Sequence, residues 1–299
     1  MVVRVVTDST ACLPAGFTGC GPGPRPLVVP VPVTIDDETH DDGGVDAAAV
    51  ITALQHRLPV TTSRIAPARL AGVYRGLVAE GATAIVSVHL SGHLSGTADS
   101  ARIAAGEVAV PVAVVDTATV AMGLGFAAGA AARWADVGAG VADVAAAARR
   151  TAAASGLWFV VRDLAHLRRG GRMTAGQALV GSALHVLPIL GIEQGRIAPV
   201  DRVRTMRAAQ RRLLELACAH IGGWSGSPAV DVALMDCPPT PGPAAAMREA
   251  IADRIAGAHI VDAWIDTVLA AHTGPGTFAL AVAPHEEPPH DCVSSTGEG

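Results

Sequence analysis

Hydroxyl side chains and glycines interrupt the apolar sequence at two places where they could hold an anion. The apolar run 84–88 ends in SGHLSGT, Ser91–Thr97, and we expect a second hydroxyl-rich loop at Thr61–Ser63, before a segment with helical spacing. Hydroxyl and backbone N–H donors at the start of a helix bind anions, so either stretch could hold a carboxylate or a phosphate. The same side chains could serve only as helix N-caps, and both interpretations stay open at this point.

A histidine and two groups of arginines are the other side chains suited to chemistry. His272 stands in HTGPG, where Gly274 and Gly276 would let a ligand approach the ring and the backbone together, although a loop histidine can also be a solvated or capping residue. Arginines cluster in LRRGGRM, 167–173, and in DRVRTMRAAQRR, 201–212. Because Arg binds phosphate and carboxylate groups bidentately, these clusters indicate either an acidic or phosphate-bearing partner or solvated helix faces.

The composition excludes several classes of enzyme and of partner. All 22 basic residues are arginine, so the chain has no lysine for a Schiff base, a pyridoxal phosphate site or a Walker A loop. The sequence also lacks the GxSxG and HExxH motifs. A net charge of −5 argues against a nucleic-acid partner. We therefore expect neither a covalently bound cofactor nor nucleic acid.

Cysteine use and the lengths of the apolar runs predict a cytoplasmic protein. The five cysteines are scattered and form no CxxC pair, which is typical of free thiols in a reducing compartment and predicts neither a disulfide framework nor a metal site. The opening MVVRVVTDST has too short an apolar run for a signal peptide. The longest apolar stretch, 117–132, is rich in Gly and Ala and short for a membrane span, so we expect a buried helix there and no membrane insertion.

The apolar pattern predicts alternating strands and helices that would position these residues. Three apolar runs of the first half end in polar loops at Thr7–Ser9, Ser91–Thr97 and Asp116–Thr117. Because the carboxyl ends of parallel strands lie at one edge of a sheet, we expect the three loops to converge. A helix should begin near Pro67, since proline is tolerated in a first helical turn.

We predict an α/β protein of two domains. Residues 1–155 should form a mainly parallel sheet with helices on both faces, and residues 156–284 a mixed sheet with helices. In the second domain a hairpin should turn at Glu193–Gly195, and the segment 258–283 should run as strand, loop and strand. The tail 285–299, rich in Pro, Glu, Ser and Gly, is expected to be disordered.

Seven motifs, taken together, make the chain similar to the DegV family over about residues 3–282. They are VTDSTACLP, TTSRIAP, SGHLSGT, VVDTATVAMGLG, LRRGGRMTAGQALVGSALHVLPIL, VRTMRAAQRR and HTGPG. Each motif alone is a weak signal, whereas seven in this order are specific. Characterised members of the family include FakB, the fatty-acid-binding subunit of bacterial fatty acid kinase.

The resemblance implies a two-domain DegV-like fold that buries one long-chain fatty acid in a tunnel. The positions matching the family's carboxylate-binding residues are Thr62, Ser95 and His272, and those shaping the loops are Gly96, Thr97, Gly274 and Gly276. A chain with only 3% aromatic residues is compatible with such a tunnel. The apolar segment 175–184 is a candidate tunnel wall, although ordinary core packing explains it equally well.

The resemblance also implies a partner protein. Arg172 and Arg204 match arginines that are associated in the family with phosphoryl transfer or with docking of the kinase. A separate catalytic subunit would bring ATP and Mg²⁺, and this chain would present the carboxylate for acyl-phosphate formation in phospholipid metabolism. The chain would then be a lipid-binding subunit without a complete active site, bacterial, cytoplasmic and monomeric on its own.

Two other functions stay open at the level of the sequence. One is a stand-alone fatty acid carrier or sensor, and the other is an acyl or phosphoryl transferase that uses His272 and the arginines. The chain departs from the family pattern at Cys12, at Arg64–Ile65 and at Gly92. We expect fatty acid binding to tolerate these departures, whereas the altered arginine clusters bear on the choice of partner.

Overall fold

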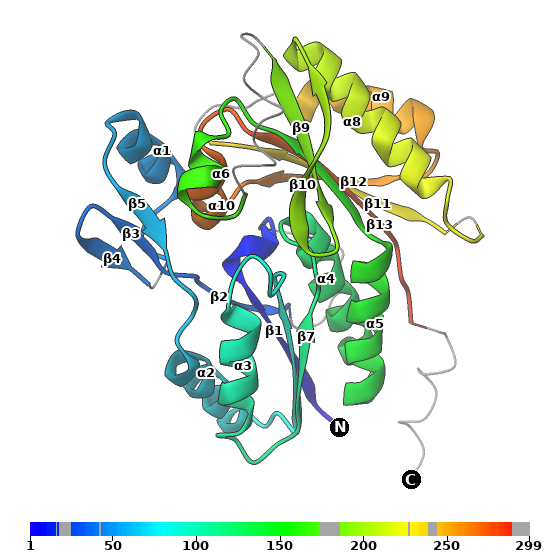
Figure 1. The fold of residues 1–299 in the computed structure, drawn as a ribbon. Helices are drawn as coiled ribbons and strands as arrows, with labels where there is room; N and C mark the ends of the chain where they lie inside the picture. Colours follow the sequence, from blue (N-terminus) through cyan, green and yellow to red (C-terminus); the bar gives the residue numbers. More distant parts are fainter. Residues whose placement is uncertain are drawn as a thin grey trace.

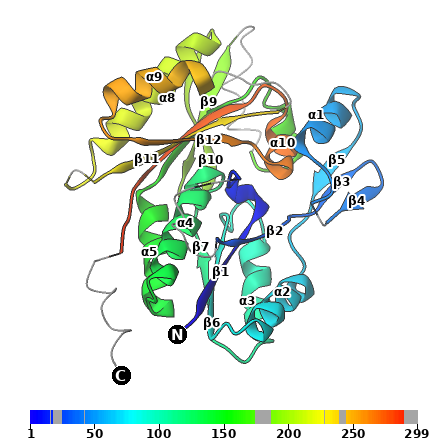
Figure 2. The same ribbon diagram turned by 180° about the vertical axis from the view of Figure 1, so that it is seen from behind.

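The computed structural model describes residues 1–15, 17, 25–41, 43–173, 186–226, 228–238 and 244–288. Within these residues it contains a parallel sheet, a mixed sheet and a small antiparallel sheet at one side (Figures 1 and 2). Helices cover the faces of the two larger sheets. The α/β architecture predicted from the sequence is therefore confirmed.

The parallel sheet comes from the first half of the chain. Its strands follow the order β2-β1-β6-β7, and every neighbouring pair is parallel. The two central strands are buried almost throughout, as expected where helices cover both faces of a parallel sheet. The four strands are β1 (Val3–Asp8), β2 (Leu27–Val29), β6 (Ala84–His89) and β7 (Val112–Asp116).

Two pairs of helices enclose this sheet. α2 (Pro67–Ala79) and α3 (Thr97–Ala105) lie together on one face, and α2 begins at Pro67 as predicted. α4 (Met122–Asp136) and α5 (Val141–Ala154) lie on the other face, and both also contact the mixed sheet (Figure 1). α4 is buried along most of its length, which confirms the expected buried helix and explains its Gly and Ala content.

The mixed sheet comes from the second half. Its strands follow the order β10-β9-β8-β13-β11-β12, in which only the β11–β12 pair is parallel among the paired strands described. β9 and β10 form the predicted hairpin, with Gln194 and Gly195 at positive φ in its turn. The strands are β8 (Gly156–Val160), β9 (Leu187–Glu193), β10 (Arg196–Val203), β11 (Val230–Asp236), β12 (His259–Trp264) and β13 (Phe278–Pro284).

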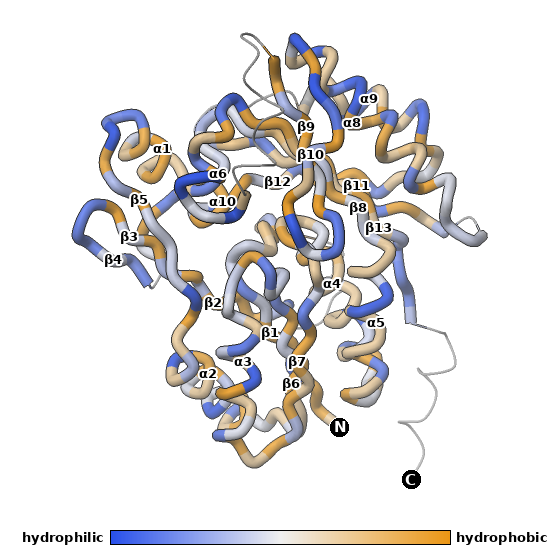
Figure 3. Tube along the Cα trace, viewed as in Figure 1, coloured by the Kyte–Doolittle hydropathy of each residue, from blue (hydrophilic) through white to orange (hydrophobic). Residues whose placement is uncertain are grey.

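The two faces of the mixed sheet carry side chains of different size. Along β13, Phe278, Leu280 and Val282 point to the outer face, where they pack with α8 (Met206–Ile221) and α9 (Ala244–Arg254). The alternate residues Ala279 and Ala281 join the inner core shared with the parallel sheet. Figure 3 shows hydrophobic segments along β6 and β7, whereas α8 and α9 alternate between hydrophobic and hydrophilic residues. Small inner side chains leave space between the two sheets.

Two local expectations from the sequence were wrong. Thr61 and Thr62 belong to β5 (Val60–Thr62) of the small antiparallel sheet, not to a loop. The segment between β12 and β13 contains a short helix, α10 (Thr267–Thr273), where we expected only a loop. Asp266 explains this helix, because its carboxylate accepts the Leu269 N–H at 2.9 Å and caps the first turn. The remaining elements are η1 (Ser9–Ala11), β3 (Val33–Ile35), β4 (Glu38–His40), α1 (Ala47–Gln55) and α6 (Ala165–Arg169).

The end of the described chain is tied to the body of the molecule. His285 and Glu286 fall in the tail expected to be disordered, yet the His285 N–H donates to the Ala229 carbonyl at 2.7 Å. The Thr151 hydroxyl donates to the Glu286 carboxylate at 3.0 Å. The rest of that tail, 289–299, and the candidate tunnel wall 175–184 lie outside the described residues. Among the described helices, none combines the length and hydrophobicity that a membrane span needs.

Candidate functional site

The polar loops that follow three parallel strands meet at one edge of the sheet. The Leu90 N–H donates to the Asp8 carboxylate at 3.1 Å, and the Gly92 N–H donates to the Asp116 carboxylate at 3.1 Å. The Ser91 N–H donates to the Thr119 carbonyl at 2.8 Å. These bonds confirm the predicted convergence and hold the Ser91–Thr97 loop from two sides.

A fully buried hydrogen-bonded chain lies beneath these loops. The Tyr74 hydroxyl donates to Ser87 Oγ at 2.8 Å, and Ser87 Oγ lies 2.8 Å from His89 Nε2. His89 Nδ1 lies 2.9 Å from Asp8 Oδ2 and donates to it, because a carboxylate can only accept. Burial raises the pKa of Tyr74 to about 12.

This chain has the connectivity of a Ser-His-Asp triad, which the sequence did not reveal by spacing. Its serine is enclosed, at 0% exposure, and its hydroxyl is bonded on both sides. Asp8 also accepts from the Thr10 hydroxyl at 2.5 Å, in addition to Leu90 N–H. The geometry therefore supports the loops and does not expose a nucleophile to a substrate.

An apolar cavity lies between the two large sheets. Its empty space, which includes solvent at the open mouth, is about 800 Å³. Most of its lining is aliphatic or aromatic. The apolar lining residues are Val31, Leu90, Leu94, Val120, Ala121, Leu157, Phe159, Leu167, Ile192, Ile197, Met235, Ile265, Val268, Leu269 and Ala279. The polar ones are Thr62, Ser63, Ser95, Arg172, His272, Thr273 and Thr277.

Thr62 and His272 are hydrogen-bonded to each other at this cavity. Thr62 Oγ1 in β5 lies 2.8 Å from His272 Nε2 in α10, although 210 positions separate them in the sequence. Burial, and then the charge of Arg172, lower the pKa of His272 to about 4. The imidazole is therefore neutral at pH 7 and has one N–H to donate.

Arg172 joins this pair to the Ser91–Thr97 loop. Its Nε donates to the Leu94 carbonyl at 3.1 Å, and a terminal guanidinium nitrogen donates to the Gly170 carbonyl at 2.5 Å. Burial lowers the pKa of Arg172 below its usual value, and an Arg side chain stays charged at neutral pH even so. The cavity thus holds a partly buried fixed positive charge next to His272.

Ser95 lines the same cavity and also bonds the start of α3. Its Oγ accepts the Thr97 N–H at 3.3 Å and lies 2.9 Å from Thr97 Oγ1. Gly96 precedes the helix, and Thr97 is its fully buried first residue. The Ser95 hydroxyl therefore bonds the first residue of α3 and lines the cavity, whereas the N-cap residue itself is Gly96.

Gly274 and Gly276 have positive φ angles of 75° and 73° in the turn after α10. A Cβ atom at Gly274 would lie 2.6 Å from His166 Cδ2, and one at Gly276 would lie 2.3 Å from Arg162 Nε. Both the backbone conformation and the close neighbours require glycine at these two positions. The turn consequently places α6 and its histidine directly against the end of α10.

The polar end of the cavity opens onto a surface depression. Thr62, Arg172 and His272 line both the cavity and this depression. Further cationic or titratable side chains of the depression are Arg57, His166 and Arg169. The cavity therefore has an apolar interior and a mouth rich in arginine and histidine.

Arg204 lies apart from this mouth. It lines a separate depression with Arg162, Leu187, Thr205 and Met206. Thr205 next to it caps α8, because its hydroxyl oxygen accepts the Ala208 N–H at 3.1 Å. Of the residues selected from the sequence, Thr62, Ser95, Arg172 and His272 come together at the cavity, and Arg204 does not.

Sequence reasoning missed several polar residues of the site. Thr273 and Thr277 line the cavity, and Arg57 and His166 line the mouth. The two threonines stand directly beside selected motif residues, so their proximity in the sequence was an available signal. Arg57 offered none, since it becomes part of the mouth only through the packing of α1 against α10.

The fold defines an α/β protein with an apolar cavity between its two larger sheets. A family model described as an uncharacterised protein of the DegV family matches residues 2–285, and the chain belongs to that family. A DegV domain-containing protein of Streptomyces coelicolor is 43% identical over 289 residues, covering 94% of this chain and 98% of the relative.

Solved structures of similar proteins share the whole fold. A DegV family protein from Thermus thermophilus, described by its fatty acid binding, is 29% identical with a TM-score of 0.84, covering 95% of this chain and 100% of that one. DegV of Bacillus subtilis, described as a fatty acid binding protein, is 27% identical with a TM-score of 0.82, covering 95% and 99%. These likenesses confirm the DegV-like fold expected from the seven motifs.

Proposed function

We propose that the chain binds one long-chain fatty acid in this cavity. The observation that carries the proposal is the distribution of polarity: an apolar interior between the sheets ends at Thr62, Arg172 and His272. A fatty acid has the same distribution, with a carboxylate at one end of an alkyl chain. The fatty acid binding of the similar proteins from T. thermophilus and B. subtilis supports the proposal.

The carboxylate would lie at the arginine-rich mouth. Neutral His272 can donate from Nε2 to Thr62 Oγ1, which leaves the Thr62 hydroxyl proton free for the ligand. Ser95 offers a second hydroxyl, and Arg172 supplies the positive charge. A carboxylate bound in this way would be stabilised by charge-assisted hydrogen bonds.

The alkyl chain would lie among the aliphatic residues of the inner faces. Removing an alkyl chain from water is favourable by about 0.8 kcal/mol per methylene, so a long chain binds tightly. Ala279 on β13 is a lining residue with a small side chain, and a larger residue there would shorten the available space. Chain-length selectivity should therefore respond to substitution at this position.

The bound carboxylate would be presented to a separate kinase that supplies ATP and Mg²⁺. The mouth carries Arg57, Arg169 and Arg172, a set suited to phosphate groups arriving from outside. Arg204, in its separate depression, would contact the kinase and not the fatty acid. The product would be an acyl-phosphate made in the cytoplasm, where the free thiols Cys12, Cys218 and Cys237 persist and the chain alone is a monomer.

Native mass spectrometry of the purified full chain tests fatty acid binding. We expect one co-purified fatty acid per chain, and loss of the longest acids from Ala279→Leu. Ala142→Leu, the same change at an exposed position of α5, is the matched control and should keep the wild-type lipid profile. A wild-type chain that stays lipid-free after incubation with long-chain fatty acids would contradict the proposal.

A second experiment separates the kinase-coupled function from the alternatives. The lipid-loaded chain is mixed with a bacterial fatty acid kinase catalytic subunit, ATP and Mg²⁺, and acyl-phosphate is trapped with hydroxylamine. Product that needs both proteins supports the proposal. ATP turnover by this chain alone would indicate a transferase, and lipid binding without any kinase reaction would indicate a carrier or sensor.

A further inference from the structure

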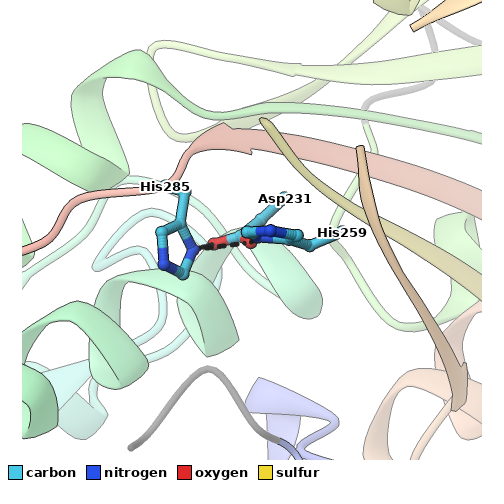
Figure 4. Close-up of side chains that lie close together, drawn as sticks. All are labelled: Asp231, His259 and His285. Carbon is cyan, nitrogen blue, oxygen red and sulfur yellow. Dashed lines mark hydrogen bonds and ion pairs between the residues drawn. The ribbon is translucent and has the colours of Figure 1, made fainter. Parts of the chain in front are cut away.

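Two histidines and an aspartate meet at one end of the mixed sheet (Figure 4). Asp231 lies near the start of β11 and pairs in register with His259, the first residue of parallel β12. His285 follows β13, which runs antiparallel to β11 on its other side. The His285 N–H bond to the Ala229 carbonyl, at 2.7 Å, fixes the backbone of the third residue.

Both imidazole rings turn the same nitrogen toward the carboxylate. His285 Nδ1 lies 2.9 and 3.0 Å from the two Asp231 oxygens, and His259 Nδ1 lies 3.3 Å from Oδ1. All three candidate ligand atoms lie within 4.8 Å of one another. The residue Asp231 is 4% exposed, whereas the His259 side chain is 55% exposed, so the group is anchored inside and open to solvent on one side.

We propose that Asp231, His259 and His285 form a binding site for one divalent transition-metal ion, with Zn²⁺ as its probe. Two imidazole nitrogens and one carboxylate oxygen are a donor set that such ions accept. Ligands at 2.0–2.2 Å in tetrahedral geometry lie about 3.3–3.5 Å apart, close to the present spacing of Asp231 and its two neighbours. The exposed side of His259 leaves a position for water.

Glu287 supplies the outer-shell contact that such a site requires. Its Oε1 lies 3.5 Å from His285 Nε2, the ring nitrogen that faces away from Asp231. Metal binding at Nδ1 needs the proton of the neutral ring on Nε2, and a carboxylate next to Nε2 stabilises that tautomer. His285 thus stands between two carboxylates, one in the site and one behind the ring.

The proposed metal site is separate from the fatty acid cavity. Met235 lines the cavity four residues further along β11 than Asp231, a separation of about 13 Å in an extended strand. The next residue after His285 connects the sheet to the helices, since Arg150 Nε donates to the Glu286 carboxylate at 2.7 Å and Arg133 Nε donates to the Glu286 carbonyl at 3.0 Å. A bound ion would therefore fasten the chain segment that joins the mixed sheet to α4 and α5.

Sequence analysis predicted no metal site because its ligands follow no short motif. The three residues are separated by 28 and 26 positions, and only the pairing of β11 with β12 and β13 brings them together. The alternative is a purely structural ion-pair cluster, in which both rings only donate to Asp231. A binding experiment distinguishes the two.

Isothermal titration of the chelator-treated full chain with Zn²⁺ tests the proposal. We expect one ion per chain, with His259→Ala and His285→Ala weakening binding by roughly 100-fold or more, and Glu287→Gln by about tenfold. Asp231→Asn, which keeps the shape of the buried residue, should also lower the affinity. His56→Ala, at an exposed histidine of another region, is the matched control and should bind as the wild type does.

Three results would overturn the metal site. The first is that the wild type does not bind Zn²⁺, and the second is that both His259→Ala and His285→Ala bind it with unchanged affinity. The third is that a His290→Ala/Cys292→Ser variant loses Zn²⁺ binding while His259→Ala retains it. Any one of these results is sufficient. Circular dichroism of each variant checks folding, and Zn²⁺ should raise the Tm of the wild type but not that of folded His259→Ala. The test does not depend on fatty acid binding.

Discussion

Two groups of polar side chains contain similar residue types but differ in their access to the cavity. They are the buried chain Tyr74–Ser87–His89–Asp8 and the cavity group Thr62–His272–Arg172. In the first, every side chain is fully buried and bonded within the protein. In the second, Thr62 and His272 bond to each other at the wall of a cavity that opens to a surface depression.

The difference shows that access, not residue type, separates a structural polar cluster from a binding site. A buried hydroxyl or imidazole whose hydrogen bonds are all satisfied within the protein contributes stability and fixes the geometry above it. A polar group beside an open apolar cavity can still bond a ligand. The first cluster should therefore respond to mutation mainly in folding, and the second mainly in ligand affinity.

The largest effect is expected for Asp8→Ala. The substitution leaves the His89 Nδ1–H and the Leu90 N–H without their acceptor inside the protein, and should lower the free energy of unfolding by about 3–5 kcal/mol. Urea denaturation at pH 7 measures it. Asp8→Asn, which keeps one acceptor oxygen and the shape, should lose less. A loss below about 1 kcal/mol for Asp8→Ala would show that the buried chain is not a structural support.

Removing His272 should weaken fatty acid binding by about 1.5–3 kcal/mol, roughly 10–150-fold, because the hydrogen bond that directs the Thr62 hydroxyl proton to the carboxylate is lost. Ser95→Ala should weaken it less, since its hydroxyl is shared with the first turn of α3. Titration of delipidated His272→Ala, Ser95→Ala and the exposed control His56→Ala with one fatty acid measures the affinities. Unchanged affinity in both site variants would refute the carboxylate assignment.

The lowered pKa of His272 predicts a pH dependence of stability. Its pKa is about 4 in the folded ligand-free chain, against about 6.5 when unfolded, so between these values the unfolded chain binds more protons. Its contribution to stability is fully present above pH 6.5 and is lost as the pH falls toward 4, by roughly 3 kcal/mol.

Urea denaturation of the wild type and of His272→Gln at pH 7, 6, 5 and 4.5 checks this pH dependence. As the pH falls, the free energy of unfolding of the wild type should decrease more than that of His272→Gln. A difference that stays constant over the whole range would mean that His272 does not titrate with a lowered pKa in the folded chain.

The smallest effect on lipid affinity is expected for Arg204→Ala, because Arg204 lines a depression separate from the cavity. Its fatty acid affinity should equal that of the wild type, while acyl-phosphate formation with the kinase should fall severalfold. Arg211→Ala, at an exposed arginine of α8, is the control for loss of a surface charge. Loss of lipid binding in Arg204→Ala would show that this arginine is structural.

Much of the fold could be predicted from the sequence because its signals are local. The start of α2 at Pro67, the β9–β10 hairpin and the buried α4 each follow from residues within a few positions of one another. The helix α10 was missed because three of its seven residues are β-branched, which favours a strand or a loop: Thr267, Val268 and Thr273. Its capping by Asp266 was the signal available.

The residue types of the site, the order of the strands along the chain and the polar loops at the ends of the parallel strands can all be read from the sequence. Three contacts depend on how the chain packs: Thr62 meets His272, His89 is enclosed while His272 lines a cavity, and Asp231 lies between two histidines. Strand pairing and helix packing join these residues across long stretches of the chain. Such contacts depend on the shape of the whole core and on no spacing within a motif.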